Sequence, residues 1–231
     1  MKPFLEKIAD RLLRKFPTSM EKVAVVLPSK RAVVFLKHYL SCKINKPIFL
    51  PQFYSIEEFI EQLSGLQVLD NISLQFRLYQ TYIKYPPNKT DSFDDFLKWS
   101  NVLLHDFNEI DRNLIDAKSI YLNLKDVKEL ESWRIDDWSL SEENLSVMQT
   151  DYINFFEGML TWYDDFNLSL LEENLAYQGM AYKLAANQIS TIDICWERVW
   201  FVGLNALTKS EEAIIDFLKK EDIARVFWDA D

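Results

Sequence analysis

Residues 23–31 decide the fold of this chain, and they read Val23-Ala24-Val25-Val26-Leu27-Pro28-Ser29-Lys30-Arg31. Five apolar residues without polar alternation predict a strand that is buried on both faces, as in a parallel sheet. Ser29 can cap the helix that follows. The apolar stripe of that helix consists of Ala32, Val33, Leu36, Tyr39 and Leu40. A strand that leads through a short turn into an amphipathic helix is typical of nucleotide-binding α/β domains.

The turn after this strand contains no glycine. A phosphate cradle needs backbone N–H groups that approach the ligand closely, and glycine permits that approach. The chain has only four glycines, and neither G-x-x-x-x-G-K-[ST] nor G-x-G-x-x-G can be written anywhere in it. The sequence therefore predicts the architecture of a phosphate-binding fold without its phosphate-binding loop.

Three further segments have β character. Residues 47–51 form a short strand candidate that is bracketed by prolines. Residues 198–204 and 223–228 are rich in β-branched and aromatic residues, and a capping box of Thr208 and Glu211 predicts a helix between them. We therefore expect an α/β domain with a parallel sheet, formed discontinuously by residues 1–54 and 190–231.

The residues between these two parts are almost wholly helical in pattern. A capping box at Ser55 opens the first helix of a large helical insertion, which we assign to residues 55–189. The last of its helices is predicted to break between Leu168 and Gly179. The later helices of the insertion are expected at about residues 71–84, 93–107, 112–121, 125–133 and 141–186.

The net charge of -10 is distributed unevenly along the chain. Residues 1–50 carry 11 Lys and Arg against 3 Asp and Glu, whereas residues 91–178 carry 6 against 20. This asymmetry suits a protein that holds a polyanion on one face and repels it from another. It is equally explained by acidic helices that aid solubility and by solvated basic residues.

The two cysteines and the lengths of the apolar segments indicate the cellular compartment of the protein. Cys42 and Cys195 are predicted to be small buried residues of a reduced protein, which favours a cytoplasmic location over a disulfide-bonded secreted one. No uncharged apolar run is long enough to span a membrane, so no membrane partner is expected.

The sequence offers little support for catalysis. The densest polar cluster, residues 105–112, includes His105, Asp106 and Glu109, whose spacing matches no metal motif and which are interpreted as a solvated helix junction. The chain has only two histidines, and neither lies in a motif with a serine or cysteine nucleophile. We expect no catalytic residue, no metal and no cofactor.

Lys30 and Arg31 form a more suggestive basic set with Lys37. The first two lie at the first turn of a helix and at the carboxyl end of a central strand, which is where ligands of open α/β sheets bind. All three residues are candidates for contacts with the phosphate backbone of nucleic acid. Two cations at a helix start can also be no more than solvated surface.

Four segments, in this order, resemble the N-terminal part of AddB-like proteins, which are helicase-like, PD-(D/E)XK nuclease-bearing subunits of bacterial double-strand-break repair complexes. The resemblance extends over nearly the whole chain and includes the closing residues 226–231, VFWDAD. The four segments are residues 25–32 (VVLPSKRA), 104–111 (LHDFNEID), 177–182 (YQGMAY) and 201–211 (FVGLNALTKSE).

The resemblance implies a RecA-like, P-loop-NTPase-like sheet domain of a superfamily 1 helicase with an inserted helical subdomain. Residues 28–31 are then similar to the helicase motif that contacts single-stranded DNA, and this role is carried over to Ser29, Lys30 and Arg31. Val202 and Gly203 stand where Mg²⁺-binding and catalytic acids are expected, so the resemblance implies an inactivated helicase region.

The expected function is that of a non-catalytic, helicase-like domain of an AddB-type repair subunit. It positions DNA, as a single strand or a duplex end, and contacts an AddA-like helicase-nuclease partner. The resemblance implies that nuclease chemistry resides downstream of this chain. Because the chain stops just after a strand, we expect it to be a fragment. The alternative is a protein-protein interaction module whose acidic helical subdomain docks another protein and never contacts DNA.

Overall fold

The computed structural model of the chain describes residues 2–86, 90–121 and 142–229. The chain divides into two compact units, which we call the sheet unit (residues 1–65 and 184–231) and the helical unit (residues 66–183). The sheet unit therefore contains residues 55–65 and 184–189, which the sequence analysis assigned to the helical insertion.

The sheet unit is built on four strands that all run parallel, in the order β2-β1-β5-β6. β1 is central, and it pairs Leu27 with Ser55 of β2 and Val26 with Phe201 of β5. The α/β class and the parallel sheet that the sequence predicts are thus confirmed. The strands are β1 (Val23–Leu27), β2 (Gln52–Ser55), β5 (Arg198–Val202) and β6 (Ala224–Phe227).

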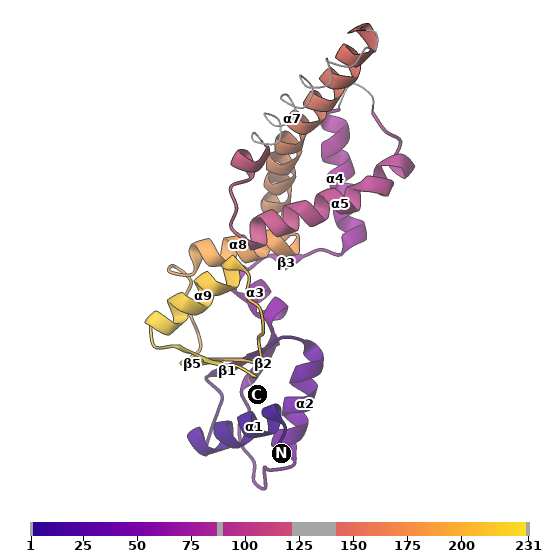
Figure 1. Cartoon of the computed structure of the whole chain (residues 1–231). Helices are drawn as coiled ribbons and strands as arrows, with labels where there is room; N and C mark the ends of the chain where they lie inside the picture. Colours follow the sequence, from indigo (N-terminus) through magenta and orange to yellow (C-terminus); the bar gives the residue numbers. More distant parts are fainter. Residues whose placement is uncertain (1, 87–89, 122–141, 230–231) are drawn as a thin grey trace. The chain divides into compact units, whose positions relative to one another are not determined.

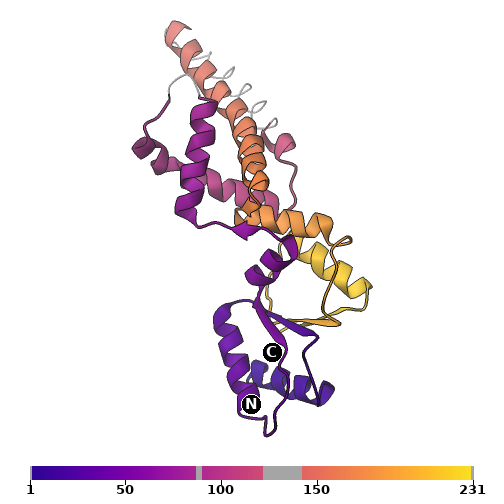
Figure 2. The same ribbon diagram turned by 180° about the vertical axis from the view of Figure 1, so that it is seen from behind.

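Helices cover both faces of this sheet (Figure 1). α1 (Phe4–Lys15) and α2 (Lys30–Ser41) lie on one face, and α3 (Ile56–Ser64) and α9 (Lys209–Lys220) lie on the other, as the reverse view also shows (Figure 2). Because successive side chains of a strand point to opposite faces, a doubly covered strand must be apolar throughout. β1 meets this requirement, since all five of its residues are buried.

The two faces have separate cores. On the α1 and α2 side, alternate residues of β1 pack with Trp200 and Val202 of β5 and with Leu12 and Leu36 of the two helices. On the opposite side, the ring of Phe59 in α3 meets Phe201 of β5 edge to face at 5.5 Å between centroids. The three-layer arrangement therefore follows from the apolar runs of β1 and β5.

The second strand lies later in the chain than the sequence indicates. Residues 47–51 were predicted as the strand, but β2 comprises Gln52–Ser55, and Phe49 only forms an isolated parallel bridge with Ser19. Proline lacks the N–H group that a ladder needs. The regular ladder accordingly begins after Pro51.

The prediction that both cysteines are buried is wrong. Cys42 and Cys195 are free thiols with exposed side chains. Cys42 is the C-cap of α2, one residue past the last helical position, and Cys195 lies in the segment before β5. Cys42 lies beyond the apolar stripe of α2, and Cys195 is exposed next to the buried Trp196.

The described residues of the helical unit form helices and a short parallel β pair. β3 (Gln67–Val68) pairs with β4 (Leu175–Ala176), and this pair joins the two ends of the unit. The predicted break in the last helix is confirmed, since β4 separates α7 from α8. The helices are α4 (Asn71–Lys84), α5 (Phe93–Arg112), α7 (Glu142–Glu172) and α8 (Gln178–Gln188), and α8 leads into the sheet unit.

The third helix of the insertion is longer than predicted. α5 was expected to end near residue 107 but continues to Arg112, where Asn113 is its C-cap. No proline or glycine interrupts residues 105–112, so polar composition alone does not end a helix there. The helix expected at 125–133 lies outside the described residues, and residues 117–121 are helical.

The core of the helical unit is aromatic and encloses one carboxylate. The side chain of Asp111, at the end of α5, is only 1% exposed and accepts hydrogen bonds from the hydroxyls of Tyr163 and Tyr177. Lys183 of α8 donates to the same carboxylate at 2.9 Å. Burial alone lowers the pKa of Lys183, but its bonds to Tyr163 and Asp111 raise it above the ordinary value. The buried charge is therefore paired.

A close helix approach in this unit can be tested with Gly179→Ala. The Gly179 N–H donates to the Asn108 side chain at 2.7 Å, and an added methyl group would collide with the Asn108 carbonyl oxygen and lie 2.8 Å from its Cα. We expect the free energy of unfolding to fall by about 1–3 kcal/mol or more. Urea denaturation measures it.

Gly158→Ala is the control, because its methyl group would meet only the Trp162 side chain, at 3.2 Å, in the middle of α7. Helix propensity favours alanine there by about 1 kcal/mol, which offsets this tight contact. Equal destabilisation by the two substitutions would contradict the close approach at Gly179.

Candidate nucleic-acid interface

The carboxyl edge of the sheet is the part of the fold where a ligand is expected. Three helices begin there: α2 after β1, α3 after β2 and α9 in the connection that follows β5. Their N-caps are Ser29, Ser55 and Thr208, each with an extended backbone and a side-chain oxygen that accepts from the helix. Helix N-termini present free N–H groups and positive potential, so each is a possible anion site.

Two of these three helix N-termini carry a carboxylate of their own. Glu58 accepts from the N–H of Ser55 at 3.0 Å, and Glu211 accepts from the N–H of Thr208 at 2.7 Å. Both form complete capping boxes, as the sequence predicts. A carboxylate at the start of a helix satisfies N–H donors and repels a second anion. The starts of α3 and α9 are therefore poorly suited to phosphate.

The N-terminus of α2 differs from the other two. Its first turn contains no acidic residue and begins with Lys30 and Arg31. The hydroxyl oxygen of Ser29 accepts from the N–H of Ala32 at 3.3 Å, so the predicted cap is confirmed. The positive end of this helix and two cations thus coincide at the carboxyl end of the central strand, which is the arrangement that favours an anion.

Lys30 has an anionic partner within the sheet unit. Its Nζ lies 3.0 Å from a carboxylate oxygen of Glu58, and the two side chains are 75% and 39% exposed. The hydrogen bond to Glu58 raises the pKa of Lys30. The Ser55 N–H contributes most to lowering the pKa of Glu58, with Lys30 adding to it. Because exposed ion pairs contribute little to stability, a phosphate can replace Glu58 at Lys30.

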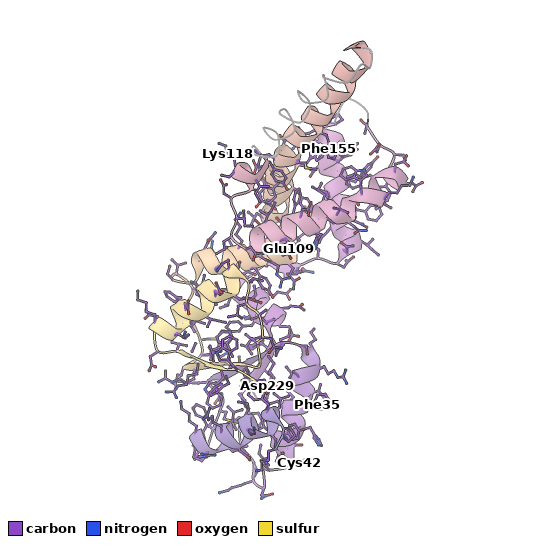
Figure 3. All side chains as sticks on the ribbon, in the orientation of Figure 1. Phe35, Cys42, Glu109, Lys118, Phe155 and Asp229 are labelled. Carbon is purple, nitrogen blue, oxygen red and sulfur yellow. The ribbon has the colours of Figure 1, made fainter. Side chains whose placement is uncertain are left out.

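Arg31 lies beside an exposed aromatic ring. Its guanidinium carbon is 5.8 Å from the centroid of Phe35, and in the described part of the chain Arg31 has no ion-pair partner. Phe35 is 46% exposed, and Figure 3 labels it on α2. Phe35 was not among the predicted site residues. It could have been found as an apolar residue that lies off the buried stripe of its helix.

Lys37 lies on the same face of α2 as Lys30, whereas Arg31 lies on a different face. Its Nζ is 5.2 Å from the ring centroid of Phe53 in β2, and Lys30 likewise reaches toward α3 through Glu58. Seven residues are close to two helical turns, so Lys30 and Lys37 share a face and lie about 10 Å apart along the helix axis. The predicted basic set is therefore split between two faces of α2.

At the end of β5, the side chains of Val202 and Gly203 supply no oxygen ligand for a metal ion. The side chain of Val202 is fully buried in the core beneath α1 and α2. Gly203 has a φ of 70°, a conformation that suits glycine, and a Cβ at this position would lie 3.3 Å from the ring of Phe4. These are the positions where the resemblance places acidic residues.

The polar cluster at 105–112 does not form a metal site in the described structure. His105, Asp106 and Glu109 are exposed on α5, and Figure 3 labels Glu109 there. Within residues 2–86, 90–121 and 142–229, no three His, Cys, Asp or Glu side chains are grouped so that they could hold a metal ion. The buried acidic residue of the described cluster is Asp111, whose carboxylate accepts hydrogen bonds from two tyrosines and a lysine.

Comparison of the sequence with the models of known protein families and with curated proteins finds no match. In the part of the chain that the structure describes, no helix combines the length and apolar character that crossing a bilayer requires.

The Lys30–Glu58 pair gives a test of the α2 interface. Glu58→Gln keeps the capping box, because glutamine can fill the same position, but removes the anion that competes for Lys30. We expect about two- to threefold tighter binding of a single-stranded oligonucleotide, measured by fluorescence anisotropy, because one repulsive charge is lost. Glu221→Gln is the control, since it makes the same charge change at the opposite edge of the sheet. An equal gain in both variants would contradict a local effect.

Glu58, whose pKa is lowered mainly by the Ser55 N–H and further by Lys30, also predicts a pH dependence of stability. The folded-state pKa of Glu58 lies below its ordinary value of 4.5, so its contribution is complete above pH 4.5 and is lost as the pH falls through the folded pKa. The difference in unfolding free energy between wild type and Glu58→Gln should be below about 1 kcal/mol, because the pair is exposed. Urea denaturation at several pH values should show this difference disappearing in acid.

Proposed function

We propose that this chain is the non-catalytic, helicase-like N-terminal part of an AddB-type double-strand-break repair subunit, and that it positions DNA and contacts a partner motor subunit. The finer fold that belongs to this proposal is a RecA-like sheet domain with an inserted helical subdomain. The parallel order β2-β1-β5-β6 and the placement of the helical unit between β2 and β5 support it.

The N-terminus of α2 is the observation that carries the DNA contact. It combines a helix end free of acidic residues with Lys30, Arg31 and the exposed ring of Phe35. Single-stranded nucleic acid is held by cations along its phosphates and by aromatic rings on which its bases stack. All of these groups are at the carboxyl edge of the sheet or within two turns of it.

The charges of the two units favour the sheet unit as the part that contacts DNA. The sheet unit carries 16 Lys and Arg against 15 Asp and Glu, whereas the helical unit carries 10 against 21. Long-range repulsion by the acidic unit directs a polyanion to the sheet unit. Within the sheet unit, the start of α2, whose first turn has no acidic residue, is the favoured contact.

The residues at the turn after β1 and at the end of β5 support a binding role rather than a hydrolytic one for this edge of the sheet. The turn after β1 has no glycine, and the end of β5 presents Val202 and Gly203. Phosphoryl transfer needs a phosphate cradle and a held Mg²⁺, and neither a valine nor a glycine side chain supplies an oxygen.

The test of the DNA contact is the double variant Lys30→Ala with Arg31→Ala. We expect weaker binding of a labelled single strand and of a forked duplex, because two phosphate contacts are removed. For the single strand, the slope of log K against log salt should become shallower by about 1.4. Fluorescence anisotropy over a salt series measures both quantities.

Lys219→Ala with Lys220→Ala is the matched control, because it removes the same charge from the last turn of α9, at the amino edge of the sheet. Ser29→Ala tests the cap separately and should affect stability more than the salt slope. Binding that is indifferent to the Lys30 and Arg31 changes, or equally sensitive to the control, would remove the assigned interface.

A second candidate function is protein-protein interaction through the helical unit, with no DNA contact. It is favoured by exposed apolar residues on one face of α4, where Ile72 is 67%, Phe76 54% and Ile83 48% exposed. The acidic balance of the helical unit as a whole would suit a basic partner. The partner proposed to bind this face of α4 is the AddA-like motor subunit.

Ile72→Ser with Ile83→Ser tests this surface. We expect at least a tenfold loss of affinity for the AddA-like subunit, measured by titration calorimetry. Val102→Ser on α5, which removes a 63% exposed apolar side chain elsewhere in the same unit, is the control. Equal affinity for the partner in all variants would exclude the α4 face.

A further inference from the structure

The sheet unit contains a second basic site, which lies apart from α2. A surface pocket of about 530 Å³ opens between α1 and the end of β6. Its volume is in the range of small-molecule sites. We call it the α1–β6 pocket, and the residues that define it are Lys7, Arg11, Arg14, Phe4, Phe227 and Trp228.

The three cations of the pocket come from one side of one helix. Positions 7, 11 and 14 are spaced by four and three residues, so they fall on the same face of α1. The neighbouring face buries Ile8 and Leu12 against the sheet. Because α1 is anchored through this buried face, its cations are held on a rigid element at the rim of the pocket.

The acidic residues of α1 are occupied elsewhere. Glu6 and Asp10 each lie 2.9 Å from the ammonium group of Lys43, and Asp10 also accepts from Lys2 at 3.0 Å. Bonds to Lys43 and Lys2 lower the pKa of Asp10, so this carboxylate stays ionised and paired. In the described part of the chain, Lys7, Arg11 and Arg14 have no ion-pair partner.

Further positive charge lies at the last turn of α1 and on the neighbouring strands, outside the residues that line the pocket. Burial lowers the pKa of Lys15, and repulsion from Arg225 of β6 and from Arg198 lowers it further, whereas Asp222 raises it. Like charges on the same surface disfavour the charged form of one another.

The wall opposite α1 is aromatic. The guanidinium carbon of Arg11 lies 5.2 Å from the ring centroid of Phe227, which fixes its position over the end of β6. Trp228 follows directly, and its side chain is 50% exposed. A large aromatic residue half open to solvent beside three cations offers a stacking surface next to a phosphate site.

We infer that the α1–β6 pocket binds a nucleotide unit, with its phosphate on Lys7, Arg11 and Arg14 and its base against Trp228. Phosphate with an adjoining aromatic base is the ligand chemistry that matches both walls of the pocket. Its source is either a free mononucleotide or one nucleotide of a single strand. This site shares no residue with the α2 interface, so the inference does not depend on the proposed function.

The experiment uses the full chain and three probes: AMP, inorganic pyrophosphate and a labelled oligothymidylate. Lys7→Gln with Arg14→Gln removes two cations and leaves Arg11 and its packing on Phe227 in place. We expect binding of AMP or of the oligonucleotide, whichever the pocket takes, to weaken about tenfold or more. Lys219→Gln with Lys220→Gln is the charge-matched control and should leave binding unchanged.

Trp228→Ala separates base recognition from charge. It should weaken binding of the nucleotide probe about tenfold while leaving pyrophosphate affinity unchanged, because pyrophosphate has no base to stack. Trp228→Phe should restore most of the nucleotide affinity. Circular dichroism and urea midpoints equal to those of wild type show that each variant is folded, and Arg14→Gln alone serves if the double variant is not.

The outcomes distinguish this pocket from the α2 interface. AMP binding that survives Lys30→Ala with Arg31→Ala but not Lys7→Gln with Arg14→Gln supports a mononucleotide pocket. Oligonucleotide binding that weakens in both double variants supports a strand that occupies both sites. Binding of all three probes that is unchanged by Lys7→Gln with Arg14→Gln and by Trp228→Ala would overturn the inference, whatever happens at α2.

Discussion

The parallel pairing of β1 with β5 is the constraint on which the rest of the structure depends. β1 is hydrogen-bonded to β2 on one side and to β5 on the other, and β5 begins at Arg198, long after β1 ends at Leu27. Parallel neighbours cannot be joined by a tight turn, so a crossover must separate them. Here the crossover has room for the entire helical unit. The central strand β1 therefore gains its second neighbour only through a contact between residues far apart in the sequence. Such pairing forms slowly, because a long loop must close first.

The same pairing determines where the chemistry of the sheet unit lies. Because all four strands are parallel, the helices that follow them begin at one edge, and their positive ends gather there. Two of these ends are neutralised by Glu58 and Glu211, which the fold uses as capping groups. The third, at α2, begins with Lys30 and Arg31 instead. The difference between a helix start that carries a carboxylate and one that carries two cations, and not the sheet itself, distinguishes the proposed anion site at α2.

The elements that local sequence determines were predicted well. The strand at 23–27, the caps at Ser29, Ser55 and Thr208, and the break after α7 all follow from residues that act within a few positions of each other. The start of β2 was misplaced, because the apolar residues before Pro51 suggested a strand whose ladder the prolines prevent. The cysteines were misjudged, because residue type predicts burial only on average.

The parts of the candidate sites that the sequence could not predict depend on tertiary contacts. Glu58 lies near Lys30 only because β2 pairs with β1, and Phe227 lies near Arg11 only because β6 joins the sheet beside β5. Asp111 is buried within a run of polar residues because Tyr163, Tyr177 and Lys183 come from segments far along the chain. Spacing along one helix indicated none of these neighbours.

Hydrolysis and binding place different demands on the carboxyl edge of a parallel sheet. Hydrolysis needs glycines that let the backbone approach a phosphate closely, and the turn at Pro28 contains none. It also needs oxygen ligands for a metal ion at defined positions, and the side chain of Val202 has no oxygen. Binding needs only cations, a positive helix end and exposed rings. β1 and β6 are two strands apart, about 10 Å across the sheet. A basic helix start after β1 and a basic pocket at the end of β6 can therefore contact neighbouring parts of one polyanion, with no residue shared between them and no hydrolytic group required.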